Sequence, residues 1–146
     1  MAKAQSLKFI YHMMNTSKTC IIDDDEIFVI VAKKIMKVAG FSEEVTNFKN
    51  GKDAIDFFRE NISNATIIPD MVFLDLNMPL MDGWDFLDAL DQLDLPKKVK
   101  VFIFTSSIDP KDEKRSQDYS IVERFIEKPL TMQKLKLISE SEETES

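Results

Sequence analysis

The sequence predicts an α/β fold, with one doubly wound parallel β-sheet and helices covering both of its faces. Two features of the 146 residues lead to this prediction. Short apolar segments alternate with longer segments of helical spacing, and this pair of segments occurs five times. The segment 71–74 is nearly all apolar, so we expect both of its faces to be buried, as in a parallel sheet. Strands separated by helices pair in parallel, which completes the prediction.

The strands and helices follow one another along the chain with ordinary boundary signals. We predict strands at 18–22, 45–48, 71–74, 99–104 and 121–126. We predict helices between Asp25 and Gly40, at 52–61, 84–93 and 109–118, and from 131 onward. Asp25 and Thr131 are suited to capping helix N-termini, Pro110 to a first helical turn, and Gly40 to a helix end.

Two of the predicted helices differ in their apolar residues. In the first helix, Ile27, Val31, Ile35 and Val38 recur at helical spacing, with other apolar residues beside them. The segment 109–118 has almost no apolar face, so we expect a short or loosely held helix there.

The composition indicates one cytoplasmic domain. We assign 1–17 to an N-terminal extension, 18–140 to the domain, and 141–146 to an acidic tail within a disordered SESEETES segment. No segment resembles a signal peptide or a membrane span. Cys20 fits a small core residue, and His12 a surface residue. A formal charge of −7 argues against a non-specific nucleic-acid surface.

Polar residues gather at the carboxyl ends of the predicted strands. Asp23 and Asp24 follow the first strand, Asp75 the third, Thr105 the fourth and Lys128 the fifth. In a doubly wound sheet these strand ends share one edge, where the working site lies. Each residue alone has an ordinary structural explanation, such as a helix cap or a turn. Their joint placement predicts a pocket with three carboxylates, a hydroxyl and an ammonium.

Such a pocket favours a hard divalent cation and phosphoryl chemistry. Three neighbouring carboxylates repel one another, and Mg²⁺, with Mn²⁺ as an alternative, would relieve that repulsion with oxygen ligands. A backbone carbonyl after Asp75 can complete the ligand set. Lys128 and the Thr105 hydroxyl can contact a phosphoryl group, and the metal and lysine together neutralise its charge. Asp75 is then the candidate nucleophile, forming an acyl phosphate.

Four motifs in order resemble the receiver domain of two-component response regulators, over about residues 18–140. They are IIDDDE, VFLDLNMPLMDGWDFL, VFIFTSS and FIEKPL. The resemblance implies a flavodoxin-like five-stranded sheet with strand order 2-1-3-4-5. It also implies a signalling protein that promotes its own phosphorylation and dephosphorylation, rather than an enzyme. The stretch DYSIVER and the residue Ser106 depart from the family's small residues, which leaves the output face less defined than the phosphorylation site.

The resemblance further implies a role for each site residue. Asp75 would accept phosphate from a sensor histidine kinase or a histidine phosphotransfer protein. Asp23, Asp24 and Asp75 would bind magnesium together with the backbone carbonyl of Asn77. Thr105 and Lys128 would contact the phosphoryl group. The aromatic Phe125 would move inward as Thr105 moves to the phosphate, and the Lys128–Pro129 bond would be cis.

Because few residues flank the domain at 18–140, we expect a single-domain regulator that acts through protein contacts rather than on nucleic acid or membranes. A downstream protein would bind the 109–138 face, and the chain would be a monomer or a phosphorylation-dependent homodimer. The alternative is a pseudo-receiver that binds proteins without phosphorylation. A haloacid-dehalogenase-like phosphatase needs a second Asp where this chain has Asn77, and a flavodoxin needs a phosphate loop where this chain has DDDE.

Overall fold

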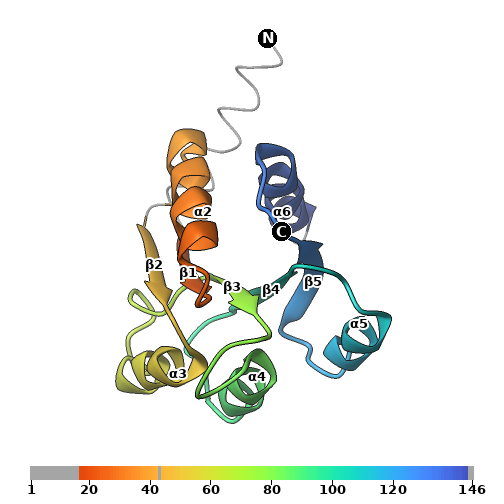
Figure 1. Ribbon diagram of the computed structural model, residues 1–146. Coiled ribbons are helices and arrows are strands. Elements are labelled where there is room, and N and C mark those ends of the chain that lie inside the picture. Colours follow the sequence, from red (N-terminus) through yellow and green to blue (C-terminus); the bar gives the residue numbers. More distant parts are fainter. Residues whose placement is uncertain (1–16, 43, 145–146) are drawn as a thin grey trace.

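Five parallel strands form one sheet in the computed structural model, which describes the backbone of residues 17–42 and 44–144, and side chains through residue 140. The strands are β1 (Lys18–Ile22), β2 (Glu44–Phe48), β3 (Met71–Asp75), β4 (Lys100–Thr105) and β5 (Val122–Glu127). Their order across the sheet is β2-β1-β3-β4-β5 (Figure 1). The predicted doubly wound sheet with order 2-1-3-4-5 is therefore confirmed.

Helices cover both faces of this sheet. They are α2 (Glu26–Ala39), α3 (Gly51–Glu60), α4 (Gly83–Asp91), α5 (Pro110–Ser116) and α6 (Met132–Thr144). Figure 1 shows α2 and α6 on one side of the sheet and α3, α4 and α5 on the other. In the part of the chain that is described, no helix is long and apolar enough to cross a membrane.

Alternate residues of the central strands enter two separate cores. In β3, Met71 and Phe73 pack with α2 and α6, whereas Val72 and Leu74 pack with α3 and α4. All five residues of this strand are buried. This pattern explains the continuous apolar run, because a central parallel strand has no solvated face.

The spacing of Ile27, Val31, Ile35 and Val38 predicted helix α2 but does not mark its buried face. Ile27 is 76% exposed and Val38 is 81% exposed. The side that packs on the sheet consists of other residues, namely Phe28, Val29, Ala32, Met36 and Ala39. The predicted caps are present, since Asp25 accepts the Phe28 N–H and Gly40 ends the helix at a φ of 61°.

Helix α5 is short, as expected from its lack of an apolar face, and aromatic and polar contacts join its end to α4. The Arg115 guanidinium lies 4.3 Å from the centre of the Trp84 ring. The Trp84 and Tyr119 rings are 5.8 Å apart, and the Tyr119 hydroxyl donates to an Asp88 carboxylate oxygen at 2.6 Å. These contacts take the place of a buried apolar stripe.

The C-terminal segment differs from its prediction. We expected SESEETES to be disordered, but α6 continues through Thr144. Leu135 and Ile138 are buried in the core shared with α2, which anchors the helix, and Glu residues extend a helix readily. The predicted extension at 1–17 lies outside the described residues except for Ser17.

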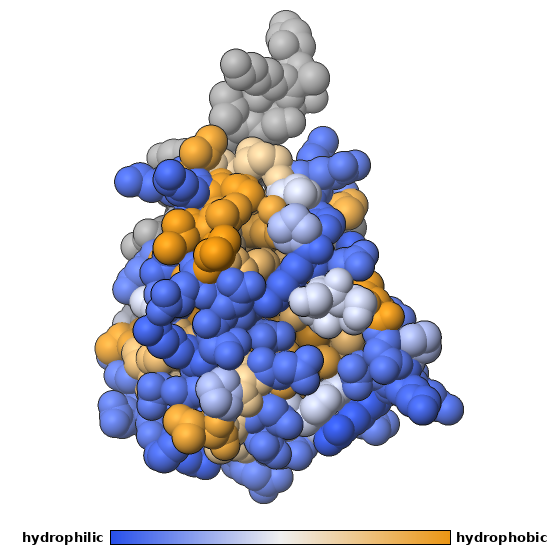
Figure 2. Space-filling view, viewed as in Figure 1, coloured by the Kyte–Doolittle hydropathy of each residue, from blue (hydrophilic) through white to orange (hydrophobic). Residues whose placement is uncertain are grey.

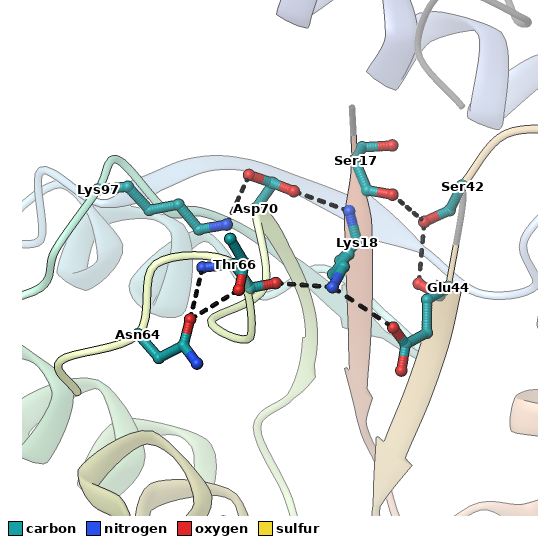
Figure 3. Close-up of polar contacts among 8 residues, drawn as sticks. All are labelled: Ser17, Lys18, Ser42, Glu44, Asn64, Thr66, Asp70 and Lys97. Atoms are coloured by element: carbon teal, nitrogen blue, oxygen red, sulfur yellow. Dashed lines mark hydrogen bonds and ion pairs between the residues drawn. The ribbon is translucent and has the colours of Figure 1, made fainter. Parts of the chain in front are cut away.

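A polar cluster joins the amino ends of the strands, at the edge of the sheet opposite the predicted site (Figure 3). The Asp70 carboxylate accepts the Lys18 backbone N–H at 2.7 Å and pairs with the Lys97 ammonium at 3.0 Å. The Lys18 ammonium donates to the Thr66 carbonyl at 2.7 Å and lies 3.7 Å from Glu44. We call this group the Asp70 cluster. It ties β1 to β2 and to the segment that enters β3.

Candidate functional site

The pairing of β1 with β3 brings two of the predicted acids together. Ile22 lies opposite Leu74 in the parallel register, so the next residues, Asp23 and Asp75, leave the sheet side by side. Asp23 is 1% exposed and Asp75 is 8% exposed. The exposed Asp24 completes a group in which carboxylate oxygens of all three residues lie within 4.8 Å of one another.

The pairing of β4 with β5 places the two remaining polar groups at the same edge. Thr105 lies opposite Glu127, and Lys128 follows directly. The Lys128 backbone N–H donates to the Thr105 carbonyl at 2.8 Å, which fixes the two strand ends to each other. The Lys128–Pro129 peptide bond is cis.

The Lys128 ammonium is the cation that faces the acidic group. It lies 2.8 Å from one Asp23 oxygen and 4.0 Å from an Asp75 oxygen, and its side chain is only 13% exposed. The other Asp23 oxygen accepts the Asp25 backbone N–H at 2.9 Å. Asp23 is thus held by the Asp25 N–H and by an ion pair with Lys128, whereas the Lys128 ammonium lies farther from Asp75.

Burial and repulsion raise the pKa of both inner acids. Loss of solvent raises the pKa of Asp75 to about 6, the negative charge of Asp23 adds to this increase, and Lys128 opposes it. Burial likewise raises the pKa of Asp23, against hydrogen bonds from Lys128 and Asp25. One ammonium therefore does not neutralise the site, which leaves it suited to a further cation.

Close backbone contacts fix the loop that follows Asp75. The Gly83 N–H donates to the Leu76 carbonyl at 2.9 Å, and the Gly51 N–H donates to the Met81 carbonyl at 3.2 Å. A Cβ atom on Gly83 would lie 2.7 Å from the Asp75 carbonyl oxygen, and one on Gly51 would lie 2.7 Å from that of Met81. Only glycine allows these approaches.

The other residues predicted for the site have the following contacts. The Asn77 N–H is 3.5 Å from an Asp75 oxygen, and the residue is exposed at the mouth of the site. The buried Thr105 hydroxyl donates to the Ser107 carbonyl at 3.0 Å. Phe125 is half-buried and packs against the core on the α3 and α4 side of the sheet.

Sequence reasoning did not assign Phe28 to the site. Its ring centre is 4.6 Å from the Lys128 ammonium. A signal was available, because Phe28 lies in the first turn of the helix after DDDE and therefore near the same sheet edge. Because phenylalanine is apolar, the sequence indicated only a packing role in the core for this residue.

The comparisons with known proteins agree with this geometry. The family model described as "Response regulator receiver domain" matches residues 19–140. The chain belongs to the response regulator receiver domain family. A two-component response regulator from Cytophaga hutchinsonii has a similar structure, with a TM-score of 0.74 and 28% identity, covering 85% of this chain and 96% of that one.

Two curated proteins are also similar in sequence to this chain. The chain is 25% identical, over 80% of its length and 74% of the relative's, to the probable methanogenesis regulatory protein FilR2 of Methanothrix harundinacea. It is 33% identical, over 58% of its length, to the putative transcription regulator BvgA of Bordetella pertussis, and this match spans only 37% of BvgA. Receiver domains are signalling modules that interact with histidine kinases and phosphotransfer proteins and bind Mg²⁺ at an acidic pocket. Asp23, Asp24 and Asp75 form an acidic cluster at the corresponding end of this sheet.

Proposed function

We propose that this receiver accepts a phosphoryl group on Asp75, in a magnesium-dependent reaction, from a histidine kinase or a histidine phosphotransfer protein. One observation carries the proposal. Carboxylates from the ends of β1 and β3 lie within 4.8 Å of one another, and the Lys128 ammonium from the end of β5 faces both inner acids. An aspartate in that setting can act as a nucleophile whose product is stabilised by cations.

The donor set fits magnesium. Asp23, Asp24 and Asp75 offer hard carboxylate oxygens, and the Asn77 backbone carbonyl would add another oxygen. When bound, Mg²⁺ supplies positive charge against the oxygens of the incoming phosphoryl group. Burial, together with the negative charge of Asp23, raises the pKa of Asp75 to about 6, and a bound cation would favour the ionised carboxylate against both effects. The residues therefore match the ion by both ligand type and charge.

The protein's own groups then carry the transfer. An Asp75 oxygen bonds to phosphorus as the nitrogen–phosphorus bond of a phosphohistidine breaks, and the imidazole leaves with that electron pair. Lys128, whose ammonium lies 2.8 Å from Asp23 and 4.0 Å from Asp75, shifts from Asp23 toward a phosphoryl oxygen. The burial of both acids keeps water from competing.

The same residues support a switch. Thr105 would exchange its bond to the Ser107 carbonyl for one to the phosphoryl group, which draws the end of β4 toward Asp75. Phe125 is half-buried beside that strand and would move inward to fill the space. A downstream protein would read this change on the face from 109 to 138, where a groove runs between α5 and β5.

The phosphodonor would approach over α2. Ile27, Ile30 and Val31 are exposed apolar side chains on this helix. Figure 2 shows hydrophobic residues gathered over α2. A surface groove beside them is lined by Val31, Lys128 and Pro129, among others. An apolar helix of the donor would bury this patch and bring its phosphohistidine to the site. The reaction belongs in the cytoplasm, where histidine kinases carry their phosphohistidine.

Labelling with acetyl phosphate tests the proposal. The native protein with Mg²⁺ should gain the mass of one phosphoryl group, and Asp75→Asn should gain none. Asp91→Asn, an exposed carboxylate on α4, is the matched control and should label normally. Full labelling of Asp75→Asn would contradict the assignment of the phosphoacceptor. A native protein that is never labelled, by acetyl phosphate or by histidine kinases, would instead be a pseudo-receiver.

A further inference from the structure

We infer that Phe28 is a positioning residue that holds the Lys128 ammonium against the acidic site. This inference rests on the proposed function and adds to it the group that prepares the lysine. The ammonium lies over the face of the Phe28 ring, 4.6 Å from its centre, and 2.8 Å from an Asp23 oxygen. An aromatic face attracts a cation most strongly where water is excluded, and both side chains are largely buried here.

Hydrogen bonds from the acidic segment before α2 fix the position of Phe28. The Phe28 N–H donates to the Asp25 carboxylate at 3.1 Å, and the Asp25 N–H donates to the Asp23 carboxylate at 2.9 Å. The Asp23 carboxylate then faces Lys128, whose ammonium sits over the Phe28 ring. These contacts form a closed loop of four residues. Asp25, which caps α2, therefore also sets the distance between the ring and the lysine.

The ring closes one side of the lysine site. Phe28 and Lys128 both line the surface groove beside α2, which also includes Pro129 and Leu130. Without the aromatic face, the long and flexible lysine side chain can turn into that groove and away from Asp75. The ring keeps the ammonium within 4.0 Å of Asp75, where a phosphoryl group would form. Preorganised charge of this kind speeds a group transfer.

Phe28 also packs in the core, so a packing role must be separated from the positioning role. Its ring lies 5.4 Å from that of Phe104. Phe41 is a matched control, because it is a fully buried phenylalanine of the same core whose ring contact is with Phe73. Phe28→Leu removes the aromatic face and keeps an apolar side chain, whereas Phe28→Tyr keeps the face.

The experiment combines NMR spectroscopy with labelling by acetyl phosphate. The ring current of Phe28 should shift the Lys128 Cε protons upfield in the native protein and in Phe28→Tyr. Phe28→Leu should lose this shift, and its labelling rate should fall roughly threefold to tenfold below that of Phe41→Leu, as expected for loss of one partly desolvated cation–π contact. Thermal unfolding of each variant shows whether it is folded at the assay temperature.

Three results would overturn the inference. They are unshifted Lys128 protons in the native protein, a shift that survives in Phe28→Leu, and equal rate losses in Phe28→Leu and Phe41→Leu. The native spectrum alone still tests the contact if Phe28→Leu proves unstable. Failure of the proposed function is distinguishable, because it appears as absence of labelling in the native protein and leaves the NMR result unaffected.

Discussion

Replacing the central acid should stabilise the metal-free protein. The pKa of Asp75 rises from 3.8 to about 6 in the folded state. The folded protein therefore holds this proton more tightly than the unfolded chain does. The resulting stabilisation is fully present below pH 3.8, the unfolded pKa, and is lost as the pH rises through about 6. At 1.36 kcal/mol per pKa unit, the ionised Asp75 costs at most about 3 kcal/mol at pH 8. Coupling to Asp23 and Lys128 reduces this, so we expect Asp75→Asn to gain about 1–2 kcal/mol.

Urea unfolding with a chelator present, from pH 4 to pH 8, measures this gain. The two proteins should be closest in stability near pH 4 and diverge as Asp75 ionises, with the variant more stable at pH 8. In thermal scans the gain corresponds to roughly 3 °C in Tm per kcal/mol. Added Mg²⁺ should stabilise the native protein more than the variant. Parallel pH profiles, or a less stable variant at pH 8, would refute the electrostatic account of the site.

Three further substitutions test other features. Gly83→Ala places a Cβ 2.7 Å from the Asp75 carbonyl oxygen and should lower the free energy of unfolding in urea by about 1–3 kcal/mol. Leu80 is 83% exposed at a φ of 67°, so Leu80→Asn should raise stability by about 0.5–1 kcal/mol, and a lower Tm would contradict this. Asp70→Asn weakens the contacts with Lys18 and Lys97 and should cost about 1–2 kcal/mol without slowing acetyl phosphate labelling, whereas slower labelling would show coupling across the sheet.

The sequence predicted the grouping of the polar side chains well, because they lie at strand ends. A strand boundary can be located to within a residue or two from the apolar run, and parallel pairing then gathers the ends at one edge. Asp23, Asp75 and Lys128 needed no further information to be placed together. The hydroxyl of Thr105 was less predictable, because its bond to the Ser107 carbonyl depends on the local turn.

The buried face of α2 was harder to predict. Its sequence, EIFVIVAKKIMKVA, carries apolar residues on more than one side, so helical spacing alone fits two faces. The sheet selects the side with Phe28 and Met36, and Ile27 and Val38 remain at the surface. Exposed apolar side chains are common on folded proteins, so an apolar residue in a helix is not by itself evidence of a buried position.

The C-terminal helix shows a different limit. Composition rich in Ser and Glu predicted disorder, but helix formation is cooperative, and Leu135 and Ile138 anchor α6 on the core. Residues that follow an anchored helix need little further stabilisation to continue it. Local composition therefore predicted too short a helix, because the residues that anchor α6 lie several positions before the Ser- and Glu-rich segment.

The stacked position of Trp84 gives the molecule a built-in optical reporter. The sequence holds one tryptophan, so indole emission reports on this point alone. Trp84 directly follows Gly83, whose N–H bonds to Leu76 beside Asp75, and its ring lies against Arg115 of α5. A displacement of α5 would change the solvent and the charge around the indole. Stopped-flow fluorescence on the unlabelled protein can therefore follow, in real time, how fast an event at Asp75 reaches the contact between α4 and α5.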